Sequence, residues 1–436
     1  MERLDEKTRG LGHDNGGADE DALAESAAEV AVSPELAAGS LRDYLRLWLA
    51  RLRGGESGVL PVVVGLVAIT IIFQSLNSKF LTSGNIVNLL VQGAVFMMLA
   101  LAEVFALLLG EIDLSAGFVA GLSGVVTAEL LTTEHGSWPW WAAILAALLA
   151  CAAIGLLHGT LITRLGLPSF VVTLGGLLGW QGVMLAILGN GGTLPIQDNV
   201  VNDVANANLT PAASWIVTLV LVAVYGLTTW RRASRRRVRG LVAPPVGFTI
   251  VQIAGVAVAG VVLVLVCNAD RGVLVPIRGM PWVLLIVVAV ATAWSVLLGR
   301  TSFGRHVYAI GGNAEAARRS GIRLARVRTL CFVLASFTAG MAGIIYASRL
   351  RSVSTNIDGG TLVLYAVAAA VIGGTSLFGG RGKAIHAVLG GIVIAAIDNG
   401  MGLQGFSAAS RNIVTAIVLI GAVTVDAVAR RSGTTR

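Results

Sequence analysis

Long apolar runs alternate with short polar connections along most of the chain. A helix of about 20 mostly apolar residues crosses the roughly 30 Å hydrocarbon core of a bilayer. From residue 58 onward the pattern predicts about 12 transmembrane spans, several of them short or interrupted by glycine: 58–75, 87–109, 114–132, 139–158, 168–189, 214–230, 246–267, 282–299, 329–348, 361–379, 385–402 and 412–429. The expected fold is therefore all-α, a polytopic membrane helix bundle with interrupted helices over residues 58–429.

Composition and charge agree with a lipid-embedded chain. Hydrophobic residues make up 55% of the sequence, charged residues make up 13%, and the mean hydropathy is +0.80. A soluble domain carries about 25% charged residues. The net charge of +8 would suit a nucleic-acid-binding protein. The arginines, however, fall between apolar spans rather than along one face of a soluble fold, so no nucleic-acid partner is expected.

The basic residues between the spans predict the orientation of the bundle. With the N-terminus in the cytoplasm, the cytoplasmic loops and the C-terminal tail hold nineteen basic residues, and the opposite loops hold six. Cytoplasmic loops carry the excess of Lys and Arg in membrane proteins. Both termini are therefore predicted to be cytoplasmic, and so are the arginine-rich loops 231–240 and 300–328.

The ends of the chain are expected to lie outside the bundle. Residues 1–40 hold ten acidic residues against three basic ones, which predicts a disordered acidic cytoplasmic tail. Residues 41–57 place leucines and Trp48 beside arginines, a pattern typical of an amphipathic lead-in at the membrane surface. Residues 430–436 are predicted as a basic cytoplasmic tail.

The sequence lacks the signatures of metal, cofactor or nucleotide chemistry. Its three cysteines form no CxxC pair and its five histidines form no HxxxH pair, so neither a metal site nor a disulfide framework is expected. It has no GxxxxGK[ST] segment, so it is not expected to bind ATP as a P-loop does. Without a nucleophile–base pair in any loop, the sequence also argues against an embedded enzyme.

The polar stretch "AIGGNAEAARRSGIRLARVR" (309–328) predicts one short helix between two spans. Asn313 suits an N-cap, Glu315 suits the positive first turn, and Gly321 suits the left-handed residue that ends a helix. A helix of seven residues, 314–320, is too short to be stable alone in water. It is either a well-capped connector or a knob that docks into a cytoplasmic partner, which its small alanines would let approach closely.

The pattern Glu-Ala-Ala-x-x-x-Gly in a cytoplasmic loop resembles the coupling segment of permease subunits from ATP-binding-cassette importers. Further segments resemble the ribose/xylose-type monosaccharide permeases, and this resemblance runs from about residue 58 to 429: "TSFGRHVYAIGGNAEAARRSGI" (301–322), "GEIDLSAG" (110–117), "VTLGGLLGWQGV" (172–183) and "AVIGGTSLFGGRGKAIHAVLGGIVIAAIDNG" (370–400). The additional stretch near 231–281 looks more like the longer xylose-type members. The chain departs from many members at Glu111, where they carry Gly.

The resemblance implies a multi-pass protein of the bacterial inner membrane that imports xylose or a similar pentose. It also implies a homodimer of permease subunits in membrane lipid, a cytoplasmic ATPase that hydrolyses ATP, and an extracytoplasmic sugar-binding protein. Importers of other sugars, nucleosides or branched-chain amino acids have a similar architecture and stay open as alternatives. The residues expected to couple the chain to its ATPase are Gly304, Arg305, Gly312, Asn313, Glu315, Ala316, Ala317 and Gly321.

Two glycine-bounded polar segments, 110–117 and 373–380, interrupt apolar runs. Both fit Gly-x-x-(Asp/Ser)-Leu-x-x-Gly, with Asp113 aligned to Ser376, and the predicted topology puts both on the same side, so that any internal repeat would be parallel rather than inverted. Irregular backbone at membrane depth lines cavities or is buried in protein. An uncharged sugar needs hydrogen-bonding groups along its route; the candidates are Asn88, Gln92, Asp113, Ser115, Thr173, Gln181, Ser376 and Asn399. The alternative for each is a hydrogen bond between helices.

A secondary transporter driven by protons is the competing mechanism. It would need an ionisable group deep in the membrane, because such groups are costly there and usually functional. Glu103 is the one acid well inside a predicted span. It has no basic or histidine residue nearby in the sequence, so this alternative is the weaker one.

Overall fold

A computed structural model describes residues 60–132, 137–189, 192–241, 243–272 and 274–433. The predicted tail 1–40 and lead-in 41–57 lie outside these residues. The chain divides into two compact units. Within the described residues, one unit is Leu219–Gly260, and the other comprises the residues up to Thr218 and from Val261 onward.

Each predicted span coincides with a helix, although the boundaries shift. Among the described residues, eight helices are long and apolar enough to cross a bilayer: α4 (Ser83–Leu108), α6 (Trp140–Arg164), α7 (Ser169–Leu188), α9 (Pro211–Val238), α10 (Val246–Asn268), α11 (Trp282–Arg300), α14 (Leu324–Leu350) and α16 (Ala384–Leu403). The other four spans hold shorter apolar helices: α3 (Leu60–Leu76), α5 (Ala116–Leu131), α15 (Gly359–Ile372) and the apolar part of α17 (Ala408–Gly433). The all-α membrane fold is confirmed, and the count of about 12 spans stays a prediction.

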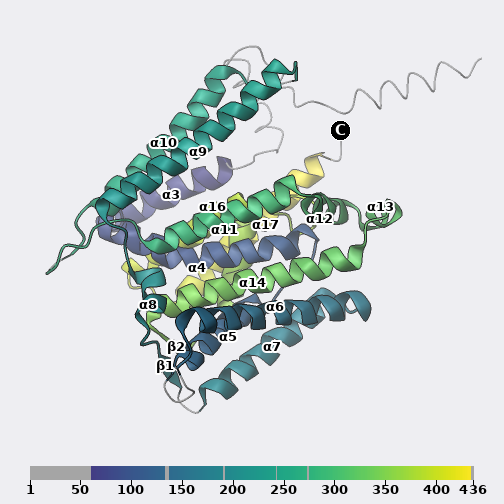
Figure 1. The fold of residues 1–436 in the computed structure, drawn as a ribbon, viewed down its shortest axis with the longest axis horizontal. Coiled ribbons are helices and arrows are strands. Elements are labelled where there is room, and N and C mark those ends of the chain that lie inside the picture. The colour runs from purple at the N-terminus through teal and green to yellow at the C-terminus, as the bar shows by residue number, and fades with distance from the viewer. Residues whose placement is uncertain (1–59, 133–136, 190–191, 242, 273, 434–436) are drawn as a thin grey trace, which may run out of the picture. The chain divides into compact units, whose positions relative to one another are not determined.

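Helix α4 forms the centre of the larger unit and packs against α14, α15 and α16. Figure 1 shows α4 beside α14. Its sequence between Gly93 and Leu108 is apolar on every side except for Glu103, and every residue of that stretch is buried. A helix that is hydrophobic all round belongs inside a bundle. The apolar window of α4 is 83% buried and that of α10 only 11%, so α4 is a core helix and α10 leaves most of its side chains open to lipid.

Glycines let the helices around α14 approach closely. A Cβ atom at Gly155 of α6 would lie 2.3 Å from the carbonyl oxygen of Phe332, and one at Gly343 of α14 would lie 1.8 Å from that of Ala120. Small residues at such contacts bring helix backbones together in membranes, where van der Waals packing rather than water drives association. Helix α14 is thereby held against both α5 and α6.

The long polar loop after α7 folds back on the bundle. Strand β1 (Thr193–Pro195) pairs antiparallel with β2 (Ser352–Ser354), which follows α14. Helix α8 (Asn199–Asn206) is capped by Asp198, whose side chain accepts a hydrogen bond from the Val201 amide at 2.9 Å. These short elements do not appear in the hydropathy pattern, because none of them is long enough to show a period.

The unit Leu219–Gly260 consists of the facing parts of α9 and α10. The side-chain amide of Gln252 donates a hydrogen bond to the Tyr225 hydroxyl at 2.8 Å and joins the two helices. The guanidinium of Arg237 donates to the Pro244 carbonyl at 2.8 Å and to the Thr249 hydroxyl at 3.2 Å. These bonds close the turn between the helices, and α9 continues to Val238, beyond the predicted end at residue 230.

Two more boundaries differ from the sequence prediction. Helix α15 stops at Ile372, so the predicted span 361–379 ends early, and residues 373–380 form a connection to α16. Residues 110–115 likewise connect α4 to α5. Segment 373–380 therefore lies between helices, and so does segment 110–117 apart from Ala116 and Gly117, which begin α5.

Candidate functional site

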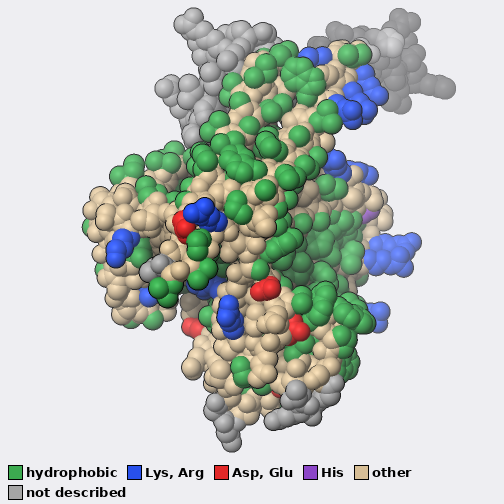
Figure 2. Space-filling view, turned by 60° about the vertical axis from the view of Figure 1, so that its left-hand side comes forward, with side chains coloured by type: hydrophobic (Ala, Val, Ile, Leu, Met, Phe, Trp, Pro, Cys, Tyr) green, Lys and Arg blue, Asp and Glu red, His purple; other side chains and the backbone are tan. Residues whose placement is uncertain are grey.

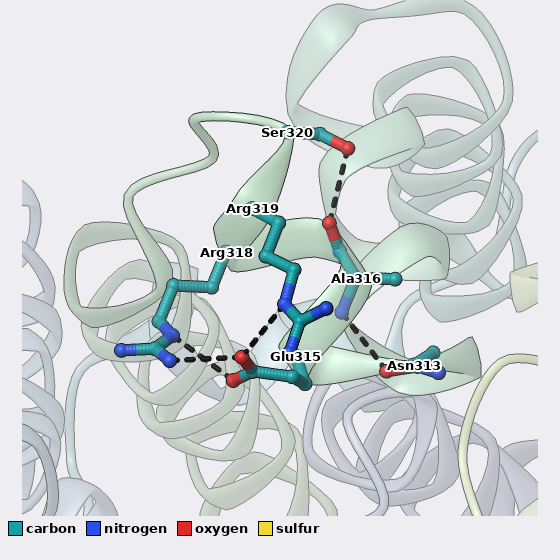
Figure 3. Close-up of polar contacts among 6 residues, drawn as sticks. All are labelled: Asn313, Glu315, Ala316, Arg318, Arg319 and Ser320. Carbon is teal, nitrogen blue, oxygen red and sulfur yellow. Dashed lines mark hydrogen bonds and ion pairs between the residues drawn. The ribbon is translucent and has the colours of Figure 1, made fainter. Parts of the chain in front are cut away.

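Helix α13 (Ala314–Arg319) forms where the sequence predicts helix 314–320, and its local signals act as expected (Figure 3). The Asn313 side chain accepts a hydrogen bond from the Ala316 amide at 3.0 Å. Gly321 has a φ of +82° and ends the helix in the left-handed region. Residues that flank the helix in the sequence, Asn313 and Gly321, thus fix both of its ends.

The charged residues of α13 pair with one another. The Glu315 carboxylate accepts from Arg318 at 2.8 and 3.0 Å and from Arg319 at 3.1 Å, as Figure 3 shows. Hydrogen bonds from Arg318 and then from Arg319 hold the pKa of Glu315 below its ordinary value. Only Ala317 is buried, while Glu315, Ala316 and both arginines are exposed. The helix therefore presents a small surface to solvent on which one acid pairs with two arginines, leaving a net charge of +1.

A groove of about 430 Å³ lies beside this helix. It is lined by residues of the segment before α13 and the start of α14, including Phe303, His306, Gly321, Arg323 and Arg326. The lining combines apolar side chains, such as Val327 and Leu330, with the basic side chains of Arg323 and Arg326. Together with the exposed surface of α13, it forms a surface that a partner protein can occupy.

Helix α12 (Ser302–Gly312) leads into α13 and is anchored to the bundle. The Thr301 hydroxyl caps it by accepting from the Gly304 amide at 3.2 Å, and the Tyr308 hydroxyl donates to the Gly382 carbonyl at 2.8 Å. A Cβ atom at Gly304 would lie 1.9 Å from the Leu298 carbonyl oxygen. Gly304 therefore permits a close turn after α11, while Arg305 is exposed.

Four glycines bring the end of α12 into backbone contact with both glycine-bounded segments. We call Gly110, Gly311, Gly379 and Gly380 the glycine junction. The Gly380 amide donates to the Leu108 carbonyl at 2.9 Å. A Cβ atom at Gly311 would lie 1.8 Å from that same oxygen and 2.4 Å from the Gly380 nitrogen.

The junction also has contact between its other members. A Cβ atom at Gly379 would lie 2.8 Å from the Gly311 carbonyl oxygen and 2.9 Å from the Gly110 nitrogen. No side chain can be inserted at these distances without moving backbone. The segments 110–117 and 373–380 thus lie side by side, and the end of α12 lies against both.

Glu111 forms an ion pair with Arg328 next to the glycine junction. The Glu111 carboxylate lies 3.2 Å from the Arg328 guanidinium, and the two side chains are 10% and 32% exposed. Burial raises the pKa of Glu111 above its ordinary value, and Arg328 partly offsets this effect. The acid that departs from the expected glycine therefore connects the α4–α5 segment to the start of α14.

A buried polar chain begins at Asp113. The amide and the hydroxyl of Ser115 donate to Asp113 Oδ1 at 3.0 and 2.5 Å, and the Ser115 hydroxyl lies 3.4 Å from His158 Nδ1. Trp180 Nε1 donates to His158 Nε2 at 3.1 Å. The indole N–H only donates, so His158 carries its proton on Nδ1 and presents it to Ser115. Thr173 joins the same region by donating to the Ile112 carbonyl at 3.2 Å.

Two acidic groups of this region have unpaired oxygens. Neither carboxylate oxygen of Glu103 has a hydrogen-bond partner among the described residues, and Asp113 Oδ2 also has none. Both side chains are fully buried. The sequence places no histidine near Glu103. In the fold, Ser115 links His158 to Asp113.

A second polar cluster joins α4 to α16. Gln92 donates to Asp398, and Arg411 lies 3.4 Å from the same carboxylate. Asn85 donates to the Asn399 side chain at 2.9 Å. Of the predicted path residues, Gln92 and Asn399 thus meet here, whereas Asp113, Ser115 and Thr173 meet in the first cluster.

The remaining predicted path residues belong to neither cluster. Asn88 is exposed on α4, and Gln181 is half-buried on α7. Ser376 is buried, and its hydroxyl accepts from the Phe378 amide at 3.0 Å within segment 373–380. The predicted set is therefore divided between two clusters and three separate positions.

Sequence reasoning missed His158, Trp180, the Glu111–Arg328 pair and the glycine junction. In the sequence, His158 and Trp180 are 22 residues apart, and Ser115 and His158 are 43 residues apart. A single polar residue in an apolar span was the available signal for His158. For the junction, the signal was the glycine pairs 311–312 and 379–380 beside segments already singled out.

Comparison with known proteins identifies the chain's relatives. The family model of the branched-chain amino acid transport system / permease component matches residues 85–423. The xylose transport system permease protein of Escherichia coli K12 is 34% identical over 387 residues, which cover 87% of this chain and 95% of the relative. No solved structure matches the chain.

Two further relatives from the same organism share most of their length with this chain. The D-allose transport system permease protein is 30% identical, with 83% of this chain and 89% of the relative covered. The ribose import permease protein is 29% identical, with 88% and 96% covered. The chain therefore belongs to this family of transport-system permeases, as a multi-pass transport subunit of the ribose/xylose-type ATP-binding-cassette importers in the bacterial inner membrane.

Proposed function

We propose that the chain is the membrane-spanning subunit of an importer that moves a monosaccharide, xylose or a similar pentose, into the cell. The observation that carries this proposal is the 34% identity to a xylose permease over 95% of that relative's length. The allose and ribose permeases, at 30% and 29% identity, are also sugar permeases. A sugar is therefore favoured over a nucleoside or an amino acid as the solute.

The importer would contain partners that this chain cannot replace. Two copies of the chain would form the pore, a cytoplasmic ATPase would hydrolyse ATP, and an extracytoplasmic binding protein would deliver the sugar. The exposed surface of α13 and the groove beside it are the surface we assign to the ATPase. The ion pairs within α13 support this assignment, because they hold the side chains of Arg318 and Arg319 against Glu315 while Ala316 stays exposed.

The glycine junction supplies the path for mechanical work. Gly311 and Gly312 end α12 and directly precede Asn313 and α13. When the ATPase moves α13, the end of α12 would push on backbone atoms of the α4–α5 and α15–α16 connections. Packed elements switch between discrete arrangements rather than deforming gradually. We therefore propose that the junction transmits closure of the ATPase to the helices that line the path.

The two polar clusters would offer hydrogen bonds to sugar hydroxyls at two depths. Asp113 Oδ2 is a buried acceptor with no partner among the described residues, and His158 is held in one tautomer by Trp180. Gln92 and Asn399 lie in the second cluster, on α4 and α16. A neutral sugar is suited to such groups, because its hydroxyls can form hydrogen bonds with them and it carries no charge that needs an ion-pair partner.

The test is ATP-driven uptake by the assembled transporter in proteoliposomes. Radiolabelled xylose should accumulate only with ATP and the binding protein present, and should be displaced more weakly by allose than by xylose itself. Calorimetric titration of the binding protein with pentoses and hexoses checks the sugar independently. Uptake that follows a proton gradient and needs no ATP would contradict the proposal and favour a proton-coupled mechanism through Glu103.

A further inference from the structure

Among the described residues of its own unit, the arginine-rich end of α9 has no acidic partner. Residues 219–260 contain six arginines, all between 231 and 239, and contain no aspartate or glutamate. Six positive charges this close together repel one another unless anions balance them. The source of those anions is the question that the unit raises.

The structure separates one of the six arginines from the others. Arg237 is half-buried and donates to the Pro244 carbonyl and the Thr249 hydroxyl. The other five are exposed, and their side chains make no hydrogen bond or ion pair with any residue in the described part of the chain. Arg237 therefore fixes the turn, and the other five are left for another role.

The five exposed arginines share one side of the helix. With 3.6 residues per turn, they fall within an arc of about 140°, and Arg237 points away from that arc. The Arg239 amide donates to the Arg235 carbonyl at 3.2 Å, so the helical spacing continues through the last of them. We define this arginine face as Arg231, Arg232, Arg235, Arg236 and Arg239.

The arginine face begins where the lipid-exposed surface of α9 ends. Leu219, Val220, Val224 and Leu227 are large apolar side chains exposed on this helix, and Trp230, 42% exposed, directly precedes the first arginine. Figure 2 shows the apolar surface of this helix pair giving way to Lys and Arg side chains at one end. Tryptophan is typical of the headgroup level of a bilayer, where its ring is apolar and its N–H is solvated. The arginines are thus expected at the depth of the phosphates.

We propose that the arginine face binds the headgroups of anionic phospholipids. A guanidinium donates two parallel hydrogen bonds to a phosphate, and several basic residues next to a span concentrate anionic lipid. The match is one of charge and of position, because exposed apolar residues directly precede the arginines along the axis of α9 and would lie at the depth of the acyl chains. The proposal does not depend on which solute is transported.

The experiment measures lipid binding by the full-length protein in detergent. Native mass spectrometry titrates dioleoyl phosphatidylglycerol against wild type and a variant with all five face arginines changed to Gln. We expect phosphatidylglycerol affinity to fall by more than about tenfold and dioleoyl phosphatidylcholine binding to stay unchanged. The single variant Arg237→Gln is the matched control and should keep its affinity. Equal phosphatidylglycerol binding by wild type and the five-Gln variant would overturn the proposal.

Two further arms exclude other anions. Soluble glycerol phosphate that competes as well as phosphatidylglycerol does would show a phosphate site and overturn the lipid assignment. A five-Lys variant keeps the charge and allows carbodiimide coupling to carboxylates. Efficient coupling to the acidic residues of segment 1–40 in phosphatidylglycerol nanodiscs would identify that segment as the occupant and overturn the proposal. Retained lipid affinity in the five-Lys variant without such coupling supports it.

Discussion

The arginine-rich segments 231–240 and 300–328 carry six and seven arginines and differ in what surrounds them. In segment 300–328, Arg318 and Arg319 pair with Glu315, and Arg328 pairs with Glu111. In segment 231–240, only Arg237 has side-chain partners among the described residues, and these partners are uncharged. A count of basic residues predicts the same side of the membrane for both segments and cannot distinguish them.

The difference teaches what each segment is built to contact. Internal ion pairs leave segment 300–328 with exposed alanine and glycine backbone, which suits close docking of a protein. Unpaired arginines leave segment 231–240 with a surface that suits anions. The backbone contacts differ as well, because a Cβ atom at Gly311 would collide with the bundle, whereas one at Gly240 would meet nothing within 4 Å. Segment 300–328 therefore has, at Gly311, a backbone contact through which the proposed coupling would act.

The largest effect is expected at Gly311. Gly311→Ala places a methyl group where only 1.8 Å separates the Cβ position from the Leu108 carbonyl oxygen, so the junction must shift. We expect ATP-driven uptake to fall by more than about tenfold, with a loss of stability of about 1–3 kcal/mol from overpacking. Uptake in proteoliposomes and thermal unfolding in detergent measure the two effects separately.

The neighbouring glycine is the control for this change. Gly312→Ala adds the same methyl group in the same sequence context, where nothing lies within 4 Å. It should keep near wild-type uptake. Equal loss of uptake in both variants would show that the pair Gly311–Gly312 acts through helix propensity alone and that the junction does not transmit work.

Helix α13 and the glycine junction differ in how far each could be predicted from the sequence. Helix α13 was predictable because Asn313, Glu315 and Gly321 act on groups no more than four residues away. The junction joins Leu108, Gly311 and Gly380, which are far apart in the sequence, so no local pattern marks it. His158 was missed for the same reason. Its role depends on Ser115 and Trp180, which lie on other elements.

The spans were predictable to a similar degree. Twelve apolar runs predicted twelve helices, because hydropathy over about 20 residues is itself the physical signal. The end of α15 was misplaced, since the predicted span was carried through the polar segment 373–380 to residue 379, whereas the helix ends at Ile372. Helix α12 was missed because its 11 residues are too few for a span and lie in an arginine-rich connection, although Phe303, Val307 and Ile310 recur at helical spacing.

The second effect concerns the pair between Glu111 and Arg328. Arg328→Gln leaves a buried carboxylate without its cation, so the pKa of Glu111 should rise further above its ordinary value. An acid with a raised folded pKa stabilises the fold below its unfolded pKa, and this stability is lost as the pH rises through the folded pKa. We expect a loss of about 1–3 kcal/mol at pH 7 and a smaller loss near pH 5. Thermal unfolding at several pH values checks this.

Two further variants isolate the pair. Glu111→Gln in the Arg328→Gln background removes the buried charge and should recover most of the stability at pH 7. Arg326→Gln changes an exposed arginine two residues away and should be close to neutral. If Arg326→Gln costs as much as Arg328→Gln, general charge rather than the ion pair accounts for the effect, and the two arginine segments become alike in this respect.

A third effect compares the glycines that end the two segments. Gly321 and Gly240 have φ values of +82° and +66°, and both have open space at the Cβ position. Alanine at either position should cost about 1 kcal/mol for the left-handed backbone. We expect Gly321→Ala to lower uptake several-fold by changing the exit from α13, and Gly240→Ala to leave uptake unchanged. Equal uptake by the two variants would remove the distinction between coupling and lipid-binding segments.

The smallest effect is expected at Glu315, the acid that segment 231–240 lacks. Its ion pairs are exposed, and exposed pairs are weakened by side-chain entropy and by salt. Its pKa lies below the ordinary value, so the pairs persist at neutral pH and are lost only as the pH falls through that lowered pKa. Glu315→Gln should therefore lower uptake by less than about twofold at pH 7, and added salt should reduce the difference further. Uptake at two salt concentrations measures both quantities. A loss of uptake as large as that of Gly311→Ala would mean that charge on α13, and not backbone contact at the junction, couples the ATPase to transport. The two arginine segments would then differ only in the source of the anions that pair with their arginines.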